Sequence, residues 1–372
     1  MTTATKEYAD GTVPLADVEA ELARQLAGEG KVPAPMLRAR LSNLVIYCNS
    51  AAHAEELSAV VPDIVAVHPA RVLLLVGQPG DELPLRASLS VWCKPGGESK
   101  ICSEQVTLKA GGSHAEQLAF AVRELLIGDL PTNVWWAPAL PPPLAGSLLY
   151  DLAENAQQII YDSIGWAEPA RGVAATGSWL AKFEREPAQG PWRVASDLNW
   201  RRLKFWRRVL GQALDPKSAP GALESISEVL VEHGPHAVIQ AWELVSWLAS
   251  RLGWKVQLGK VKPGVEIAWQ VVAPHGLLSV RIRRLSDGPS EIRRVRVQCQ
   301  VAGEPHTFNI AVQKDMRLAV MLENIEAAPR TVAVQCPTLA QLVAQQLSDR
   351  ERDPVFRASM AVAEVFARTV LG

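Results

Sequence analysis

The chain contains the stretch Asp197-Leu-Asn-Trp-Arg-Arg-Leu-Lys-Phe-Trp-Arg-Arg-Val-Leu210, which brings two tryptophans and five cationic residues into about four helical turns. Ser196 or Asp197 can serve as the N-cap of a helix here. A step of about 100° per residue then predicts one apolar side, made by Leu203, Trp206, Val209 and Leu210. Another side carries Arg201, Lys204 and Arg208, and Arg202 and Arg207 flank the apolar stripe.

This predicted helix has two interpretations. It is either an amphipathic surface helix whose arginine stems cover apolar neighbours, or an anchor for another protein. The second interpretation rests on residue type, because Trp and Arg supply the large, rigid contacts that dominate binding at protein interfaces. The partner-binding candidates are Trp200, Arg201, Arg202, Trp206, Arg207 and Arg208.

The spacing Asp-Leu-x-Trp-x-Arg-Leu-x-x-Trp-Arg, which begins at Asp197, resembles the signature of the OpcA family, the glucose-6-phosphate dehydrogenase assembly proteins. Further stretches resemble this family in its order: Asn43-Leu44-Val45, His68-Pro69-Ala70-Arg71, Leu130-Pro131 with Trp135-Trp136, and the run from Trp247 to Trp254. The resemblance covers roughly residues 35–350. It implies a non-catalytic protein without a cofactor, which binds glucose-6-phosphate dehydrogenase, favours its active oligomer and supports the oxidative pentose phosphate pathway and the supply of NADPH.

Composition narrows the class of protein. A chain of 372 residues with 48% hydrophobic and 21% charged residues is typical of two globular domains. A net charge of −1 excludes a general attraction to polyanions, and the bulky apolar face of the helix at 197–210 argues against nucleic-acid binding there. No segment has the eighteen or so uncharged apolar residues that span a bilayer, so we expect a cytoplasmic protein without a membrane partner.

The order of the predicted elements indicates the fold class. Strands and helices alternate in the first half, which predicts an N-terminal α/β domain over residues 1–214 with a mixed sheet and packed helices. Short β-type runs separated by turn residues predict a C-terminal α+β domain over residues 215–372, with an antiparallel sheet and helices. The boundary rests on a linker-like stretch at 215–221. Residues 165–190, rich in Gly, Pro and Ala, read as irregular.

Arginines alternate with apolar residues on two neighbouring predicted strands. Arg281 with Arg283, and Arg294 with Arg296, should each point to one side of the sheet. The pattern indicates either a solvated face or a second basic surface that binds an acidic partner or a phosphorylated ligand.

The five cysteines form no Cys-x-x-Cys pair, which is typical of a reducing compartment. Cys93 and Cys102 flank a loop that reads as a hairpin, so they could face each other as a redox pair. Two separate buried thiols are the commoner arrangement and the one we expect.

Known catalytic and metal-binding motifs are not found in the sequence. It has no Gly-x-Gly-x-x-Gly after a strand, no phosphate-binding Gly-x-x-x-x-Gly-Lys-Ser/Thr loop and no His-Glu-x-x-His. His233 and His236 are separated by a Gly-Pro turn, which does not match a zinc-binding helix, so no metal site is expected. Ser113 and Glu116 fit a helix-capping box better than a nucleophile elbow.

A different class of function also has candidate residues. His68 and Arg71 lie at the start of a predicted strand, and Asp162 lies at the end of another. Such positions often hold functional side chains in α/β proteins. The alternative is therefore a sugar-phosphate-binding protein or enzyme with its site near the strand ends, although turn formation and strand entry also explain these residues.

Overall fold

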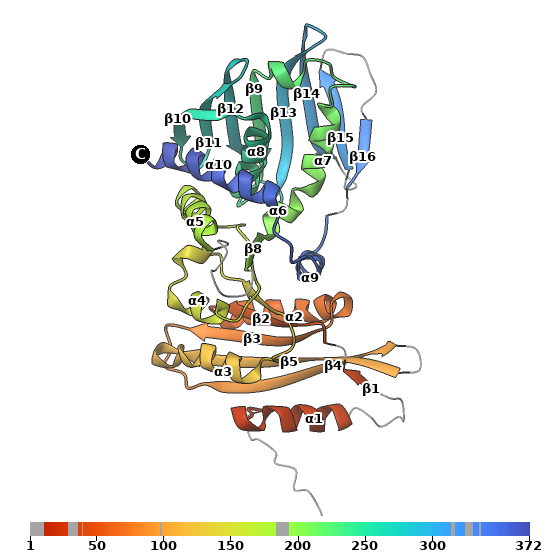
Figure 1. Ribbon diagram of the computed structural model, residues 1–372, viewed down its shortest axis with the longest axis vertical. Helices are drawn as coiled ribbons and strands as arrows, with labels where there is room; N and C mark the ends of the chain where they lie inside the picture. The colour runs from red at the N-terminus through yellow and green to blue at the C-terminus, as the bar shows by residue number, and fades with distance from the viewer. Residues whose placement is uncertain are drawn as a thin grey trace, which may run out of the picture.

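The computed structural model describes residues 11–28, 36–38, 40–96, 99–183, 193–313, 317–323, 330–334 and 336–372. Figure 1 shows two sheets, one above the other, joined by helices. None of the helices in the described part is both long and apolar enough to cross a membrane.

The first sheet contains the strands β1 Met36–Arg38, β2 Ser42–Cys48, β3 Ala70–Gln78, β4 Arg86–Gly96, β5 Ser99–Gly111, β6 Thr132–Trp136, β7 Gln158–Tyr161 and β8 Val194–Asp197. Six of them lie in the order β5-β3-β2-β6-β7-β8, all parallel. Counted along these six, the order is 3-2-1-4-5-6, that of doubly wound dinucleotide-binding folds. Strand β4 pairs antiparallel with β5, which confirms the predicted mixed sheet.

Helices cover both faces of this sheet. On one face lie α2 Ala51–Val67 and α9 Leu339–Ser348, and on the other lie α3 Gln117–Leu125 and α4 Ser147–Ala153. Every residue of β2 is therefore buried, as expected for a parallel strand between two helical layers. The adjacent Trp135 and Trp136 point to opposite faces, and both are core residues. Helix α1 Val18–Gly28 packs beside β4.

The second sheet contains β9 Glu228–His233, β10 Lys255–Lys262, β11 Glu266–Ala273, β12 Gly276–Arg284, β13 Ile292–Val301, β14 Glu304–Gln313, β15 Arg317–Glu323 and β16 Arg330–Ala333. Its order is β10-β11-β12-β9-β13-β14-β15-β16. The predicted antiparallel sheet needs one correction, because β9 lies in the middle and runs parallel to β12. The central position of β9 agrees with its sequence. Val229, Leu230 and Val231 are all buried, and three consecutive residues are buried in a central strand but not in an edge strand.

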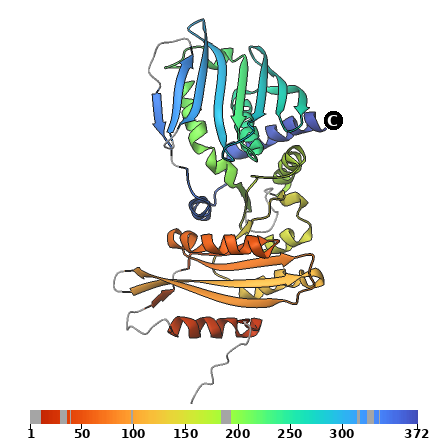
Figure 2. The same ribbon diagram turned by 180° about the vertical axis from the view of Figure 1, so that it is seen from behind.

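Helices α7 Lys204–Ala213, α8 Val238–Leu252 and α10 Pro354–Leu371 cover one face of the second sheet (Figure 1). The other face has no helix over it in the described part of the chain (Figure 2). The arginines expected on this face are paired: Arg281 with Glu228, Arg283 with Glu266 at 2.9 Å, and Arg294 with Glu232 at 3.3 Å. Charges of both signs therefore alternate here, as on a solvated face.

Helix α5 Pro169–Phe183 corrects the expectation of an irregular stretch at 165–190, of which residues 184–190 lie outside the described part. Its small residues are what allow the helix to pack closely on α10. A Cβ atom added to Gly177 would lie 2.6 Å from Cβ of Glu364, so only glycine fits this contact.

The predicted domain boundary after residue 214 stays a prediction. The first sheet ends at Asp197, and α6 Leu198–Arg202 and α7 follow it directly. Helix α7 lies beside the second sheet in both views, although residues 1–214 were predicted as one domain (Figures 1 and 2). Conversely, α9 comes late in the chain and packs on α2 of the first sheet.

Two local predictions were wrong. Cys102 is disulfide-bonded, and the strand register places Cys93 directly opposite it, so two separate thiols are not what the hairpin holds. The side chain of Cys93 lies outside the described part. Ser113 does not form a capping box with Glu116, because its hydroxyl and its backbone N–H both donate to the Glu82 carboxylate.

We expect Gly177→Ala to lower the free energy of unfolding by about 1–3 kcal/mol, because the new methyl group forces α5 and α10 apart. Gly211→Ala is the matched control. Gly211 is also helical, has no atom within 4 Å of an added Cβ, and should gain up to about 1 kcal/mol. Chemical denaturation of both variants measures the difference, and equal effects would contradict the close contact.

Candidate functional site

The predicted helix at 197–210 forms, but as two helices. Asp197 is the N-cap of α6, and its Oδ1 accepts the N–H of Asn199 at 2.8 Å. The helix is interrupted at Leu203, where ψ is −8°, and α7 begins at Lys204. The predicted apolar side is confirmed, because Leu203, Trp206, Val209 and Leu210 are all buried.

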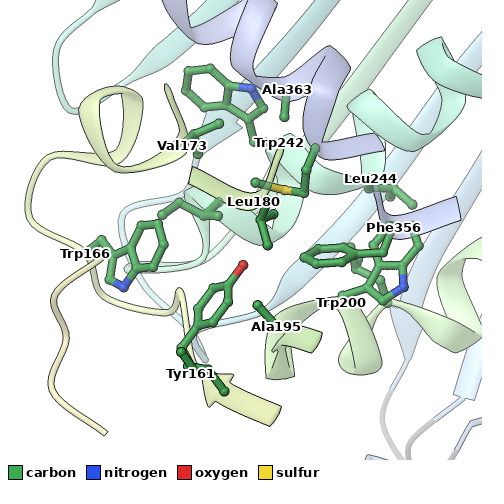
Figure 3. Close-up of a cluster of buried hydrophobic side chains, with 14 of the residues drawn as sticks. Tyr161, Trp166, Val173, Leu180, Ala195, Trp200, Trp242, Leu244, Phe356 and Ala363 are labelled. Carbon is green, nitrogen blue, oxygen red and sulfur yellow. The ribbon is translucent and has the colours of Figure 1, made fainter. Parts of the chain in front are cut away.

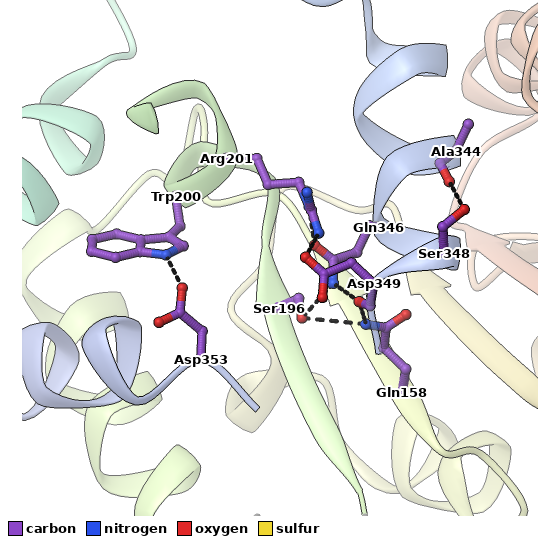
Figure 4. Close-up of polar contacts among 9 residues, drawn as sticks. All are labelled: Gln158, Ser196, Trp200, Arg201, Ala344, Gln346, Ser348, Asp349 and Asp353. Carbon is purple, nitrogen blue, oxygen red and sulfur yellow. Dashed lines mark hydrogen bonds and ion pairs between the residues drawn. The ribbon is translucent and has the colours of Figure 1, made fainter. Parts of the chain in front are cut away.

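Trp200 joins α6 to the start of α10. Its indole Nε1 donates to Oδ2 of Asp353 at 2.7 Å, and its ring lies 5.4 Å from that of Phe356 (Figures 3 and 4). Asp353 is the N-cap of α10 and accepts the N–H groups of Val355 and Phe356 through its other oxygen. One carboxylate therefore holds both the tryptophan and the end of the last helix.

Arg207 also contacts this tryptophan. Its guanidinium carbon lies 3.5 Å from the centre of the Trp200 ring, a cation–π contact. Its Nη1 also donates to the carbonyl of Trp200 at 2.8 Å. Burial lowers the pKa of Arg207 to about 10, which still leaves it charged at neutral pH.

Arg201 connects α6 to the end of α9. It donates to Gln346 and forms an ion pair with Asp349 at 2.6 Å (Figure 4). Gln346 in turn donates to Oγ of Ser196 at 3.0 Å, and Gln158 donates to the carbonyl of Asp349 at 3.2 Å. The network joins β7, β8, α6 and α9, which are far apart in the sequence.

A cavity of about 350 Å³ lies between these segments. Trp200, Arg201 and Arg207 line it from α6 and α7, and Asp349 and Asp353 line it from the opposite side. The volume is at the small end of the range for ligand sites. Three of the six partner-binding candidates therefore meet in one place.

The other three candidates have different environments. Trp206 is 7% exposed and belongs to the core, where it lines a cavity of about 200 Å³ together with Gln240 of α8 and Leu318 of β15. Arg202 forms a two-point ion pair with Asp162 at 2.7 and 2.8 Å. Arg208 is exposed on α7. Spacing alone could not separate these roles, because the partners of Trp200, Arg201 and Arg202 lie 40 to 153 positions away.

Two buried carboxyl groups lie beside the Arg202–Asp162 pair. Burial, with the charge of Asp162 nearby, raises the pKa of Asp197 to about 7. Burial also raises the pKa of Glu243 on α8 well above its usual value, and the neighbouring Asp197 adds to this effect. Glu243 and Arg251 are the two charged residues among the 15 of α8, and this is the signal in the sequence that could have singled out Glu243.

The alternative candidates do not form one site. His68 and Arg71 lie at the start of β3, whereas Asp162 follows the end of β7, and parallel strands put these positions at opposite edges of the sheet. His68 is buried between the hydroxyls of Ser42 and Ser348, each at 3.2 Å, and burial lowers its pKa. Arg71 is buried against Glu19 and Glu104. Each side chain has a structural partner.

Two family models match the chain. Residues 61–178 match the model described as the N-terminal domain of a glucose-6-phosphate dehydrogenase subunit, and residues 193–360 match that of its C-terminal domain. The chain belongs to the OpcA family. The two family models together match all of residues 61–360 except 179–192. The matched residues include most strands of both sheets of this OpcA-family chain.

Curated relatives carry the same family name. OpcA of Synechocystis sp. is 32% identical over 214 residues, which is 56% of this chain and 42% of the relative. OpcA of Nostoc punctiforme is 31% identical over 199 residues, which is 53% of this chain and 40% of the relative. Both names refer to the OxPP cycle. The match thus spans less than half the length of each of these relatives.

Solved structures with a similar fold share little sequence. An oxidoreductase from Sinorhizobium meliloti matches with a TM-score of 0.51 and 11% identity, over 90% of this chain and 97% of the other. A super-repressor mutant of Gal80p from Saccharomyces cerevisiae matches with a TM-score of 0.52 and 8% identity, over 89% and 95%. These likenesses show the fold alone.

A doubly wound sheet of this order implies a dinucleotide, but the residues at the expected place do not fit one. The turn between β2 and α2 has no glycine from Cys48 to Ala54, and Oγ of Ser50 already accepts the N–H of His53. Tyr47 stacks on Trp136 at 4.6 Å, at the ends of β2 and β6 where the strand order reverses. A Cβ added to Gly77 would lie 2.5 Å from the Tyr47 hydroxyl, so this ring also covers β3.

Asp197→Asn tests the buried carboxyl. In the folded protein the pKa of Asp197 is raised, so its contribution to stability is present at low pH and is lost as pH rises from about 4 through about 7. The asparagine cannot titrate. We expect the free energy of unfolding of the variant minus that of the wild type to increase from pH 5 toward pH 7, at up to about 1.4 kcal/mol per pH unit, as chemical denaturation at each pH measures.

The control is Asp287→Asn, because Asp287 lies on an exposed turn between β12 and β13. Its difference from wild type should stay flat across the same pH range. A flat curve for both variants would mean that Asp197 is ionised in the folded protein throughout.

Proposed function

We propose that this chain is a non-catalytic subunit that binds glucose-6-phosphate dehydrogenase, favours the active oligomer of the enzyme and so supports the oxidative pentose phosphate pathway. The descriptions of the two matched family models and the names of the relatives support the partner. One observation carries the non-catalytic part: a dinucleotide-type sheet in which the pyrophosphate turn has no glycine and Tyr47 and Trp136 lie at the switch point.

Activation of this kind needs no chemistry from the subunit. A protein that binds the active form of an enzyme more tightly than the inactive form shifts the population toward the active form. The shift equals the difference between the two binding free energies, and a coupling of 1–3 kcal/mol corresponds to roughly 5–150-fold. The subunit therefore needs only a stable surface that binds the active form of the enzyme.

The surface that we propose is the cationic part of α6 and α7 around the 350 Å³ cavity, formed by Arg201, Lys204, Arg207 and Arg208. Lys204 and Arg208 are exposed, and Arg207 is held rigidly by its contact with Trp200. Rigid cationic side chains lose little conformational entropy on meeting a carboxylate-rich partner. Trp206 and Arg202 support this surface from beneath.

The first test is an assay of the glucose-6-phosphate dehydrogenase of the same organism with and without this purified protein, with light scattering on the same mixtures. We expect activity to rise up to an equimolar ratio, together with a complex of defined mass. Unchanged activity and no complex at micromolar concentrations would overturn the proposal.

Variants on α7 distinguish residues of the proposed binding surface from residues of the core. The double variant Lys204→Ala, Arg208→Ala should weaken activation of the dehydrogenase and make it less dependent on salt, because it loses the charge pairs with the partner that salt screens. The melting temperature of this protein should change little, because both side chains are exposed. Trp206→Ala is the contrast: removing a buried tryptophan costs about 3–5 kcal/mol of unfolding free energy. Full activation by the double variant would place the dehydrogenase elsewhere on this chain.

A further inference from the structure

The structure has a second cavity, of about 360 Å³. Its walls come from four places: the loop after β7 with the start of α5, the end of β9 with the turn before α8, the hairpin of β10 and β11, and the end of β12. The residues that line it include the apolar Trp166, Val238 and Ile267 and the polar His233, Lys262 and Arg284. It shares no residue with the cavity at α6 and α7.

His233 is the buried polar group of this cavity, since only 2% of the residue is exposed. Its Nδ1 lies 2.7 Å from the carbonyl of Gly234, and a carbonyl can only accept, so Nδ1 carries the proton. Burial and the charge of Arg284 lower the pKa of the ring, which favours the neutral form. A neutral ring protonated at Nδ1 leaves Nε2 as a hydrogen-bond acceptor.

Basic side chains line the same cavity. Arg284 ends β12, Lys262 ends β10, and His236 lies in the turn before α8; all three are exposed. The acidic residue of the lining, Glu266, is already paired with Arg283 at 2.9 Å. An anionic group placed here meets two permanent positive charges, and α8 begins beside it at Val238 without a side-chain cap.

We propose that this cavity binds a small hydroxylated phosphate ester, with its phosphate group beside Arg284 and Lys262 and a hydroxyl group donating to Nε2 of His233. The apolar walls at Trp166, Val238 and Ile267 contact the carbon skeleton. Two positive charges match a phosphate dianion better than a single carboxylate. The site is independent of the partner surface and adds a metabolite that this subunit binds by itself.

Calorimetric titration of the full chain, without any dehydrogenase, tests the site. The probes are glycerol 3-phosphate and glucose 6-phosphate, with inorganic phosphate and glucose as the two parts of the second ester. We expect at least one ester to bind more tightly than either part alone. Binding of no ester at millimolar concentration would overturn the proposal, whatever the result with the dehydrogenase.

Three variants assign the contacts. Arg284→Gln should weaken both the ester and inorganic phosphate by about tenfold or more, the usual effect of losing a hydrogen bond to a charged group. His233→Asn keeps a donor for the Gly234 carbonyl and removes Nε2, so it should weaken the ester and leave inorganic phosphate unchanged. Arg330→Gln, on the far edge strand β16, should change neither affinity.

The outcomes decide between specific and adventitious binding. Equal affinity of Arg284→Gln and wild type for the ester would overturn the site, and so would equal loss in Arg330→Gln. Circular dichroism and the melting temperature check that His233→Asn folds. Where it does not, Lys262→Gln takes its place, and its exposed side chain should cost ester affinity with no loss of stability.

Discussion

The structure depends on the contacts that Asp197 makes at the point where the first sheet ends. Asp197 is the last residue of β8. Its carboxyl group caps α6 and accepts the N–H of Ser163, which lies in the loop after β7. It does this fully buried, next to the Arg202–Asp162 ion pair and Glu243. The raised pKa values of Asp197 and Glu243 limit the net charge that is buried here. The angle at which the chain leaves the first sheet for the second is therefore set by a few polar atoms.

Much of the fold could be predicted from the sequence, and particular residues show why. Helix α8 has regular apolar spacing and ends at Gly253, whose φ of +67° is the left-handed cap expected there. The buried strands β2 and β3 are continuous apolar runs. Helix α5 was missed because its two glycines lower helix propensity; in the structure Gly177 allows the close contact with α10, and Gly172 allows one with Trp166 and Pro141. The short apolar run of β9 could be a strand or a helix by periodicity alone, and its place between β12 and β13 depends on pairings that periodicity does not contain.

Less of the site could be predicted. The Trp/Arg stretch was singled out, but which of its arginines are paired depends on Asp162 and Asp349, which lie 40 and 148 positions away from them. Asp162 was considered for a different site, and Asp349 does not stand out in the sequence. The histidines at 233 and 236 were considered only as metal ligands. Their relation to Arg284 appears once β9 and β12 are seen to pair, with His233 opposite Arg284 in register. Functional geometry here comes from long-range pairing.

Helix α9 has a consequence for how the protein is made. Its residues Leu342, Val343 and Leu347 complete the apolar layer over Leu44 and Ile46 of β2, which are synthesised some 300 residues earlier. A nascent chain that has emerged only as far as the first sheet therefore has a parallel sheet with one face partly uncovered. Intermediates of this kind aggregate or require a chaperone. The N-terminal half cannot finish its core during translation until α9 has emerged.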